Sequence, residues 1–382
     1  MSTAPLHGRR IAEVLATSTG GVGTHVRSLV GPLGRAGALL RVCGPAATDE
    51  LFGFGAAGAA FRPVQIGPVP GDPRAVLALA RATRGADLVH AHGLRAGLVA
   101  ALSRHLVPHP AGGRASLVLT LHNALQPSGG AGRWVLSRVE AATIRAADLV
   151  LAASGDLADN AWQAGARDVR VAPVSAPPLP APTRDRDAVR AELGVPDGRP
   201  LVVAVGRLHP QKSYGTLLDA AAEWSDPTAV DTAGTGAPVV VVAGDGPQEA
   251  ELSARIAAER LPVTLLGRRT DVADLLAAAD VCVLPSVWEA RSLTAQEALR
   301  SGTPLVATRV GGIPELVGDA AVLVPPGDAA ALAGAVRDLL ADPARAGQLA
   351  DAGRVRAAQW PDDADTARGL VAVYRELLGA PA

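Results

Sequence analysis

The sequence predicts an α/β protein with two doubly wound, parallel-sheet domains that face a central cleft. Its 382 residues exceed what one ordinary core accommodates, which favours two domains of similar size. Hydrophobic residues make up 48% of the chain and charged residues 19%, as in a globular protein. Short β-branched runs alternate with longer Ala- and Leu-rich segments on both sides of a proline-rich stretch, which is the pattern of parallel sheets covered by helices.

The first half of the chain contains six short apolar runs that predict strands. Strands buried on both faces read as continuous apolar runs, whereas the segments between them have the length and composition of helices. The clearest helical segments are residues 24–35 and 73–83. The predicted strands are residues 11–16, 39–44, 88–90, 116–121, 149–152 and 169–172.

A proline-rich stretch, residues 173–182, separates the two halves. It favours neither a helix nor a central strand, so we expect a hinge between domains 1–180 and 181–358. Residues 359–382 form a last amphipathic segment, which predicts a helix that packs back toward the first domain. The second set of predicted strands is 201–205, 239–243, 263–266, 281–284, 305–307 and 321–323.

Charge and cysteine content restrict the setting and the partners. Residues 1–180 hold 17 arginines against ten acidic residues, a balance of +7, whereas the whole chain is at −1. We therefore expect the first half to meet an anionic partner, and nucleic acid is not expected. Cys43 and Cys282 lie inside apolar runs and predict buried thiols in a reducing compartment. No signal peptide or membrane span is expected. The predicted location is cytoplasmic, with peripheral contact at the inner membrane face left open.

Lys212 is the only lysine among 36 basic residues and follows the predicted strand 201–205. An ammonium on a flexible stem acts as a point charge suited to phosphate oxygens. Arg207 offers a second cation in the same loop, and Gly206 lets the backbone turn closely. A solvated surface lysine is the alternative interpretation.

A second constellation spans residues 289–297 and follows the predicted strand 281–284. A helix beginning near Ser292, Leu293 and Thr294 would direct backbone N–H groups at a ligand, which predicts a diphosphate site. Glu297, about one turn later, offers acceptor oxygens for paired hydroxyls such as those of ribose, and Glu289 offers them for a sugar. Alternatively, both glutamates only complement the helix dipole.

The first half adds a glycine-rich turn and three histidines. The turn at residues 18–23 includes Gly21 and departs from GxGxxG, and no acidic residue ends the next strand, which disfavours a dinucleotide dehydrogenase. His122 follows the predicted strand 116–121 and is expected at the ligand-facing edge as a polar or acid–base group. His90 and His92 have metal-like spacing, but no Cys or carboxylate cluster is expected to complete a site. We interpret them as packing or acceptor-side groups and predict no metal.

These segments together resemble a known family over nearly the whole chain. In their order and spacing they are similar to the retaining family-4 glycosyltransferases of the GT-B fold, the glycosyl transferases group 1, whose two domains are Rossmann-like. The first half contributes STGGVGTHV, DLVHAHG, TLHN and ADLVLAAS. The second half contributes GRLHPQKSYGTLLDAA, VVVAGDGP, LLGRRTDVADLLAAADVCVLPS, the E-x7-E segment 289–297 and SGTPLVATRVGGIPELV.

The resemblance implies a retaining, metal-independent hexosyltransferase that needs no cofactor. It would move a sugar from a GDP- or UDP-sugar to a hydroxyl of a glycan, a lipid-linked intermediate or a small metabolite. Arg207 and Lys212 would stabilise the departing diphosphate. The other implied roles are Glu297 at the ribose, Glu289 at the transferred sugar, the amides of 292–294 at phosphate, Arg268 near the base, Gly21 at phosphate and His122 at the sugar.

Two departures from the family pattern bear on the choice of donor. Ala290, Arg291 and Ser292 stand where members commonly have a small residue, Phe and Gly, so Arg291 is a candidate to alter sugar preference or to add a phosphate contact. The segment VAPVSAPPLP lacks the usual Gly-Val-Asp ending. Two alternatives stay open: a non-catalytic nucleotide-sugar binder and a sugar-nucleotide epimerase on the same fold. A phosphorylase on this fold would need a lysine for pyridoxal phosphate, and the only lysine is already assigned to the diphosphate.

Overall fold

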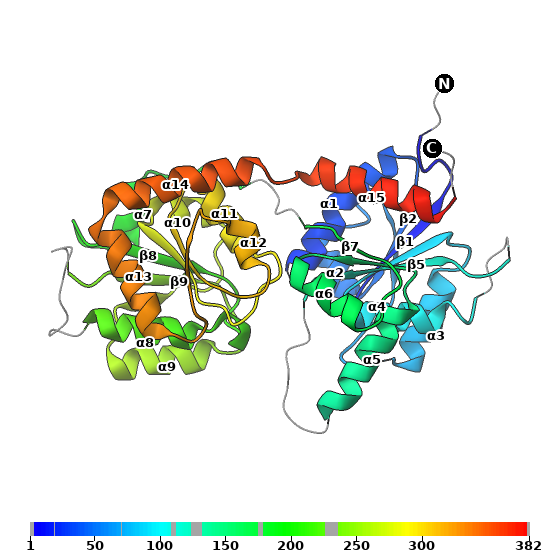
Figure 1. Ribbon diagram of the computed structural model, residues 1–382, viewed down its shortest axis with the longest axis horizontal. Helices are drawn as coiled ribbons and strands as arrows, with labels where there is room; N and C mark the ends of the chain where they lie inside the picture. The colour runs from blue at the N-terminus through cyan, green and yellow to red at the C-terminus, as the bar shows by residue number, and fades with distance from the viewer. Residues whose placement is uncertain are drawn as a thin grey trace. The chain divides into compact units, whose positions relative to one another are not determined.

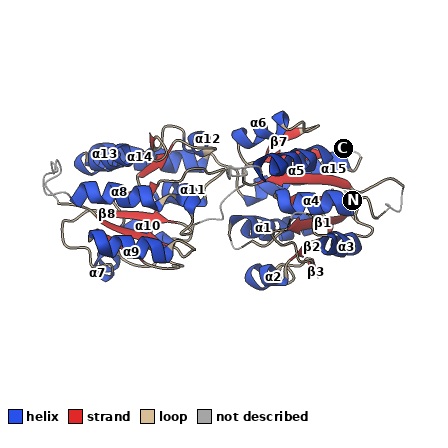
Figure 2. Ribbon diagram, turned by 90° about the horizontal axis from the view of Figure 1, so that it is seen from below, coloured by secondary structure: helices blue, strands red, loops and turns tan. Residues whose placement is uncertain are grey.

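The computed structural model describes residues 4–18, 20–69, 71–107, 112–123, 132–174, 179–225 and 236–379, without the side chains of residues 132, 133 and 135. The chain divides into two compact units. Unit 1 comprises Met1–Pro177 and Pro361–Ala382, and unit 2 comprises Pro178–Trp360. In each unit helices cover both faces of a parallel sheet (Figures 1 and 2). Residues 175–178 of the expected hinge lie outside the described residues.

Unit 1 contains a seven-stranded, all-parallel sheet in the order β3-β2-β1-β4-β5-β6-β7. The order reverses between β1 and β4, and doubly wound sheets bind ligands beyond the carboxyl ends of strands at such a point. All six predicted strands are confirmed. Sequence reasoning missed β3, a largely exposed edge strand that ends in a proline. The strands are β1 Arg10–Leu15, β2 Leu39–Gly44, β3 Ala60–Pro63, β4 Leu88–His92, β5 Ser116–Leu121, β6 Leu149–Ala152 and β7 Val169–Val171.

Unit 2 contains a six-stranded parallel sheet in the order β10-β9-β8-β11-β12-β13. Every predicted strand is confirmed, and the order reverses between β8 and β11. Successive residues pack on opposite faces: Leu201 and Val203 belong to one core cluster, and Val202 belongs to the other. The strands are β8 Leu201–Val205, β9 Val239–Ala243, β10 Val263–Leu265, β11 Val281–Leu284, β12 Leu305–Thr308 and β13 Val322–Val324.

The last helix, α15 (Asp363–Leu377), belongs to unit 1 although it ends the chain. Asp362 caps it in a reciprocal capping box with Asp365, as expected of the acidic run there. Leu370 and Tyr374 are buried in the same core cluster as Ile11 of β1. The other helices of unit 1 are α1 Gly21–Arg35, α2 Ala46–Phe52, α3 Pro73–Ala82, α4 Leu94–Ser103, α5 Gly132–Ala146 and α6 Gly155–Gln163.

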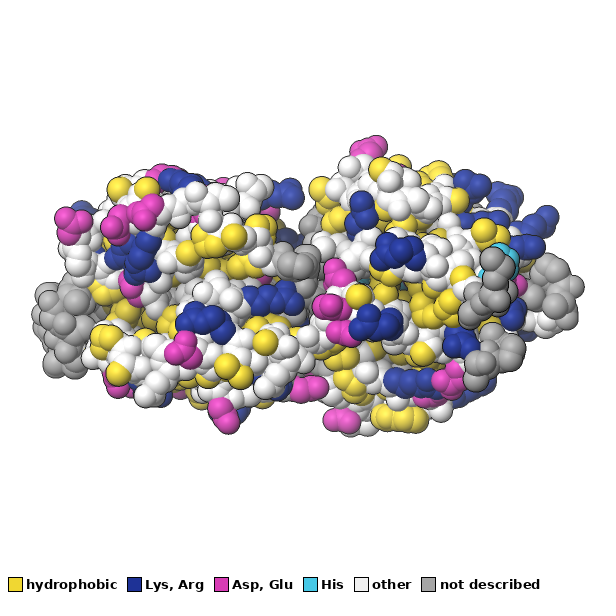
Figure 3. Space-filling view, turned by 90° about the horizontal axis from the view of Figure 1, so that it is seen from above, with side chains coloured by type: hydrophobic (Ala, Val, Ile, Leu, Met, Phe, Trp, Pro, Cys, Tyr) yellow, Lys and Arg dark blue, Asp and Glu magenta, His cyan; other side chains and the backbone are white. Residues whose placement is uncertain are grey.

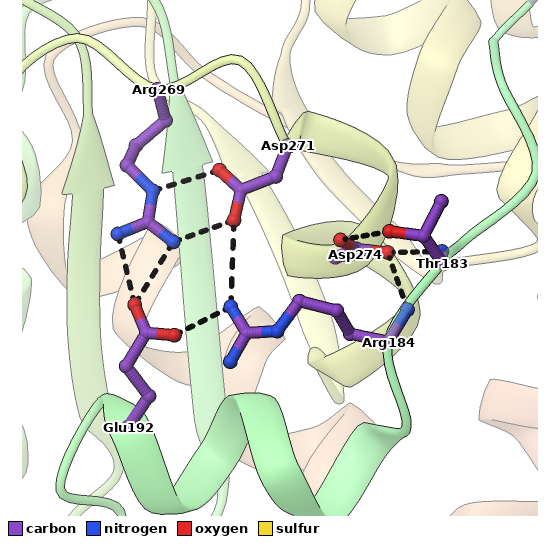
Figure 4. Close-up of polar contacts among 6 residues, drawn as sticks. All are labelled: Thr183, Arg184, Glu192, Arg269, Asp271 and Asp274. Atoms are coloured by element: carbon purple, nitrogen blue, oxygen red, sulfur yellow. Dashed lines mark hydrogen bonds and ion pairs between the residues drawn. The ribbon is translucent and has the colours of Figure 1, made fainter.

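Figure 4 shows how the chain is anchored where it enters unit 2. The buried Asp274 carboxylate accepts hydrogen bonds from the backbone N–H of Thr183 at 2.6 Å and of Arg184 at 3.2 Å. Arg184 also pairs with Glu192 at 2.5 Å. These bonds fix residues 183 and 184, which precede the first helix of unit 2, so this segment forms part of unit 2. The helices of unit 2 are α7 Arg186–Glu192, the 3₁₀ turn η1 Pro210–Lys212, α8 Tyr214–Ser225, α9 Glu249–Glu259, α10 Val272–Ala278, α11 Leu293–Ser301, α12 Ile313–Val317, α13 Ala329–Ala341 and α14 Pro343–Ala358.

The boundaries of the two units change the balance of charge in unit 1. Helix α15 brings two arginines and four acidic residues of segment 361–382 into unit 1, which lowers its basic balance from +7 to +5. On the face drawn in Figure 3, the basic side chains of unit 1, at the right, are interspersed with acidic ones.

Cys43 and Cys282 are buried free thiols, as predicted. Within the described residues, no helix combines the length and apolar character that crossing a bilayer requires.

Candidate functional site

Lys212 and Glu289 form an ion pair at the carboxyl edge of the unit 2 sheet. Lys212 ends η1, in the loop after β8, and its Nζ lies 2.6 Å from Glu289 Oε1. The Ser286 hydroxyl donates to the same oxygen at 2.7 Å. The Lys212 side chain is 18% exposed and that of Glu289 is 9% exposed. Two residues singled out separately in the sequence are therefore brought into one half-buried site, where charge interactions are stronger than in water.

Backbone contacts hold the loop that carries Glu289. The Gln211 side chain donates to the Trp288 carbonyl at 2.9 Å, and the Gly312 N–H donates to the Glu289 carbonyl at 2.9 Å. Gly311 has φ +50°, and a Cβ at this position would collide with the Glu289 carbonyl oxygen. The two glycines of the VGGIPE segment therefore set the position of Glu289. The sequence alone does not link this segment to Glu289, because the contact joins residues more than 20 positions apart.

Gly206, just after β8, leaves room for the side chains of Lys212 and Tyr214. Gly206 has φ +155°, and a Cβ there would lie 2.9 Å from the Tyr214 hydroxyl and 3.2 Å from Lys212 Cε. Arg207 and Arg268 are exposed in the loops after β8 and β10. In the described part of the chain, no hydrogen bond or ion pair joins either arginine to the Lys212–Glu289 pair. Their predicted contacts with a donor therefore remain predictions.

Helix α11 begins at Leu293, where the sequence placed a helix start. The Ser292 hydroxyl caps it by accepting from the Ala295 N–H at 3.3 Å. The Thr294 hydroxyl donates to the Val205 carbonyl at 2.9 Å, which ties the first turn of α11 to the end of β8. The amino end of this helix and the loop with Lys212 are thereby fixed to the same strand. Cations and the positive end of a helix dipole are both suited to a diphosphate.

Glu297 lies one turn into α11 and is largely buried. Burial raises the pKa of Glu297 to about 7, against the opposing effect of Arg300 and Lys212. Its carboxyl group therefore changes charge near neutral pH. A carboxyl group tuned in this way, beside a cation at a strand edge, is typical of a functional position.

Arg291, the departure from the family pattern, packs against Trp360. Its Cζ lies 5.5 Å from the centre of the indole ring. Burial lowers the pKa of Arg291 to about 10, and its buried Nε and Nη2 have no hydrogen-bond partner within the described residues. The arginine thus stacks on an aromatic ring that the sequence did not connect with it.

In unit 1 the structure corrects the expectation that no carboxylate joins His90 and His92. The side chain of Glu13, from β1, lies with Oε2 2.8 Å from His92 Nε2 and 3.2 Å from His90 Nδ1. All three side chains are buried, so the two histidines are internal packing groups. These atoms lie within 4.8 Å of one another. Hydrogen bonds already use them, and we treat the three residues as a hydrogen-bonded cluster.

Two further residues complete this cluster. The Tyr374 hydroxyl, from α15, donates to Glu13 Oε1 at 2.8 Å, and His90 Nε2 lies 2.6 Å from the Thr120 hydroxyl. Burial alone would raise the pKa of Glu13, but the neighbouring His90 and His92 outweigh burial and hold it well below its usual value. Glu13 is therefore an ionised carboxylate inside the protein. The one signal for it in the sequence is an acidic residue in the middle of an apolar strand.

His122 extends this cluster toward the edge of the unit 1 sheet. Its Nε2 lies 3.1 Å from His92 Nδ1, and its ring lies 5.6 Å from that of His25. Burial, followed by the charge effect of His92, lowers the pKa of His122 well below its usual value. A neutral imidazole donates a hydrogen bond from one nitrogen and accepts one at the other, but near neutral pH it has no imidazolium proton to give up. The acid side of the expected acid–base role is therefore not supported. Gly21 begins α1, and the loop 124–131 after His122 lies outside the described residues.

Comparisons with known proteins cover both units. Residues 20–177 match the family model "Glycosyl transferase 4-like domain", and residues 199–342 match "Glycosyl transferases group 1". Alpha-maltose-1-phosphate synthase of Mycobacterium tuberculosis (strain ATCC 25618 / H37Rv) is 32% identical, over 94% of this chain and 96% of its own length. D-inositol 3-phosphate glycosyltransferase of Nocardia farcinica is 33% identical over 76% of this chain and 67% of its own length.

Solved structures agree on the fold. Sucrose-phosphate synthase from Thermosynechococcus elongatus superposes with a TM-score of 0.79 at 25% identity, covering 98% of this chain and 100% of that one. Anabaena HepE in complex with UDP-glucose gives 0.78 at 24% identity, covering 96% and 99%. Two Rossmann-like units and a relative above 30% identity along nearly the whole chain lead to one conclusion. The chain belongs to the group 1, family-4 glycosyltransferases of the GT-B fold, which act on nucleotide-sugar donors.

Proposed function

We propose that this protein is a retaining hexosyltransferase that moves a sugar from a GDP- or UDP-sugar to a hydroxyl acceptor without a metal ion. The observation that carries the proposal is the Lys212–Glu289 ion pair, 2.6 Å long, beside the amino end of α11. A departing nucleoside diphosphate gains negative charge in the transition state. Fixed cations and helix N–H groups that face this charge stabilise it, which is the work that a metal ion does in other transferases.

Donor binding rearranges the ion pair in this proposal. The Lys212 ammonium turns to the diphosphate oxygens, and the Glu289 carboxylate turns to hydroxyls of the transferred sugar. Because the two groups hold each other until then, each is kept near its working position at little entropic cost. Arg207 adds a second cation from the same loop, and Glu297 accepts hydrogen bonds from ribose hydroxyls. We propose retention of the anomeric configuration because of the family resemblance. The NMR signal of the anomeric proton in the product tests it.

We further propose that the acceptor carries phosphate. Unit 1 has a basic balance of +5, and two similar proteins are named for products or substrates that bear phosphate. Arg95 is exposed in the first turn of α4, immediately after β4, at the same edge of the sheet as His122. Arg95→Ala is expected to raise the KM for a phosphorylated acceptor several-fold and to leave donor affinity unchanged. An unchanged acceptor KM would remove Arg95 from the site.

The test of the donor site is a titration of UDP, GDP and their sugar conjugates against the wild type, Lys212→Ala and Arg345→Ala. Arg345 is an exposed residue of α14 and serves as the matched control. Removing the lysine is expected to weaken binding and to lower turnover by about a hundredfold, whereas the control stays near wild type. A change within about twofold in both quantities, roughly 0.4 kcal/mol, would contradict the assignment. A protein that binds these ligands but transfers no sugar to any acceptor would be a binder and not an enzyme.

A further inference from the structure

Unit 1 contains a buried chain of polar groups that ends at His122. It runs from Glu13 through His92 to His122, with contacts of 2.8 Å and 3.1 Å. Glu13 and His92 are buried, whereas His122 is half-buried. The family resemblance gives a role only to His122, the outermost member, at the transferred sugar. Burying the other two members costs free energy on folding, because a charge and its hydrogen-bond partners must be removed from water.

The chemistry of Glu13 sets the direction of the first hydrogen bond. An ionised carboxylate can only accept, so the Tyr374 hydroxyl donates to Oε1 and His92 donates from Nε2 to Oε2. Burial lowers the pKa of His92 to about 4. His92 is therefore neutral near pH 7 and carries its one proton on Nε2. Its other nitrogen, Nδ1, is left as an acceptor.

The second hydrogen bond follows from the first. His92 Nδ1 faces His122 Nε2 at 3.1 Å, so His122 must supply the proton and carries it on Nε2. A neutral His122 with its proton on Nε2 has a bare Nδ1. Among the described residues, no group forms a hydrogen bond with that atom. The opposite tautomer of His122 would place two lone pairs face to face, which costs the hydrogen bond and adds repulsion.

We propose that Glu13 is a positioning residue that acts through His92 to hold His122 in its Nε2–H tautomer. In this tautomer Nδ1 accepts a hydrogen bond from a hydroxyl of the donor sugar. The inference rests on the proposed function only for the identity of that hydroxyl. Catalytic contact belongs to His122, whereas Glu13 and His92 decide which of its nitrogens bears the proton.

The surroundings of His122 keep it neutral, which the scheme requires. The groups near it are His25 from α1 and His92 and His90 from β4, and Glu13 from β1 lies behind His92. None of these imidazoles offers His122 a negative charge, and the one carboxylate lies on the far side of His92. Protonation of His122 would also remove the acceptor on Nδ1. Donor affinity should therefore fall only at pH values well below neutrality.

The first test observes the tautomer itself by nitrogen-15 NMR of the histidine rings in the full-length protein. The His122 resonances are assigned by their loss in His122→Gln. The expected result is a protonated Nε2 and an unprotonated Nδ1. A protonated Nδ1 in the wild-type protein would overturn the inference, and this result does not depend on whether any buried variant folds.

The second test changes the first member of the chain. In Glu13→Gln the Tyr374 hydroxyl, which donates at the Oε1 position, holds the amide oxygen there and leaves the amide NH2 facing His92. The NH2 donates to His92 Nε2, which turns the His92 proton to Nδ1 and the His122 proton to Nδ1 as well.

We expect the His122 tautomer to shift and turnover with the donor sugar to fall by about tenfold, with a smaller change in acceptor KM. Thr120→Val is the matched control, because it removes a buried hydrogen bond to His90 outside the path to His122. It should leave the tautomer unchanged.

The two proposals fail separately under these tests. If the tautomer is as expected but no nucleotide sugar is turned over, the proposed function is wrong and the proton arrangement stands. If Glu13→Gln folds and shifts neither the His122 tautomer nor the rate, the positioning role is wrong while the transferase activity stands.

Discussion

Two carboxylates, Glu289 in unit 2 and Glu13 in unit 1, differ in the partners that surround them. Glu289 is paired with a lysine that keeps some exposure, and both groups face a strand edge. Glu13 is sealed among two imidazoles and a tyrosine hydroxyl, without exposure to water. An ammonium on a flexible stem can exchange a carboxylate for a phosphate, whereas a fully satisfied buried cluster cannot change partners cheaply. The first arrangement is therefore suited to ligand exchange, and the second to holding a fixed proton pattern.

The largest effect should come from breaking the exchangeable pair. Glu289→Gln keeps the size of the side chain but removes the charge that pairs with Lys212 and that, in the proposed function, accepts hydrogen bonds from sugar hydroxyls. We expect turnover to fall by about a hundredfold or more. Turnover is measured from initial rates of nucleotide release. The control is Glu249→Gln, which changes an exposed residue in the first turn of α9. A rate equal to that of the control would show that the pair has no part in catalysis.

The next effect concerns the backbone that positions Glu289. Gly311→Ala adds a Cβ that collides with the Glu289 carbonyl oxygen at φ +50°, so the loop must shift. We expect about 2–3 kcal/mol lower unfolding free energy and weaker donor binding. Gly347→Ala is the control, since a Cβ there meets nothing within 4 Å inside α14, and it should stabilise by about 0.5–1 kcal/mol. Chemical denaturation measures both. Equal stability of the two variants would contradict this account of the loop.

Helix α15 contacts the rest of unit 1 through both buried and exposed side chains, and these contacts should differ in their contribution to stability. Tyr374→Phe removes the hydroxyl that donates to Glu13 and should cost about 1–2 kcal/mol of unfolding free energy. Glu376→Gln breaks the exposed pair between the same helix and Arg170 and should cost less than about 1 kcal/mol. Urea unfolding of both variants orders the two effects. The reverse order would mean that the Glu13 cluster contributes little to docking the helix.

The smallest effect is the pH dependence of Glu297. Burial raises its pKa from 4.5 to about 7, so the folded protein binds this proton more tightly than the unfolded chain. The contribution of Glu297 to unfolding free energy therefore falls as pH rises from 4.5 to about 7 and is constant above that. In the proposed function ribose hydroxyls donate to the ionised form of Glu297, so nucleotide affinity should rise a few-fold between about pH 6 and pH 8. Titrations at both pH values test this, and the rise should vanish in Glu297→Gln. A pH dependence that persists in this variant has another source.

The sequence predicted the sheets well, because parallel buried strands leave a local apolar signature. The edge strand β3 lacks that signature, since it is short and exposed. Strand ends are local too, so Lys212, Glu289 and His122 could be placed at the carboxyl edges of the sheets before their neighbours were known. Which groups touch is not local: Tyr374 lies 361 positions from Glu13, and only the return of α15 brings them together. A single acid inside an apolar strand does not name its partners.

The most direct measurement of the central claim is nucleotide release from a panel of UDP-, GDP- and ADP-sugars, with phosphorylated sugars and cyclitols as acceptors. The wild type and Lys212→Ala are compared at equal concentration. We predict that one UDP- or GDP-sugar supports turnover that depends on acceptor and that Lys212→Ala loses about a hundredfold of that rate. Turnover that is equal in the two proteins would contradict the proposed donor site.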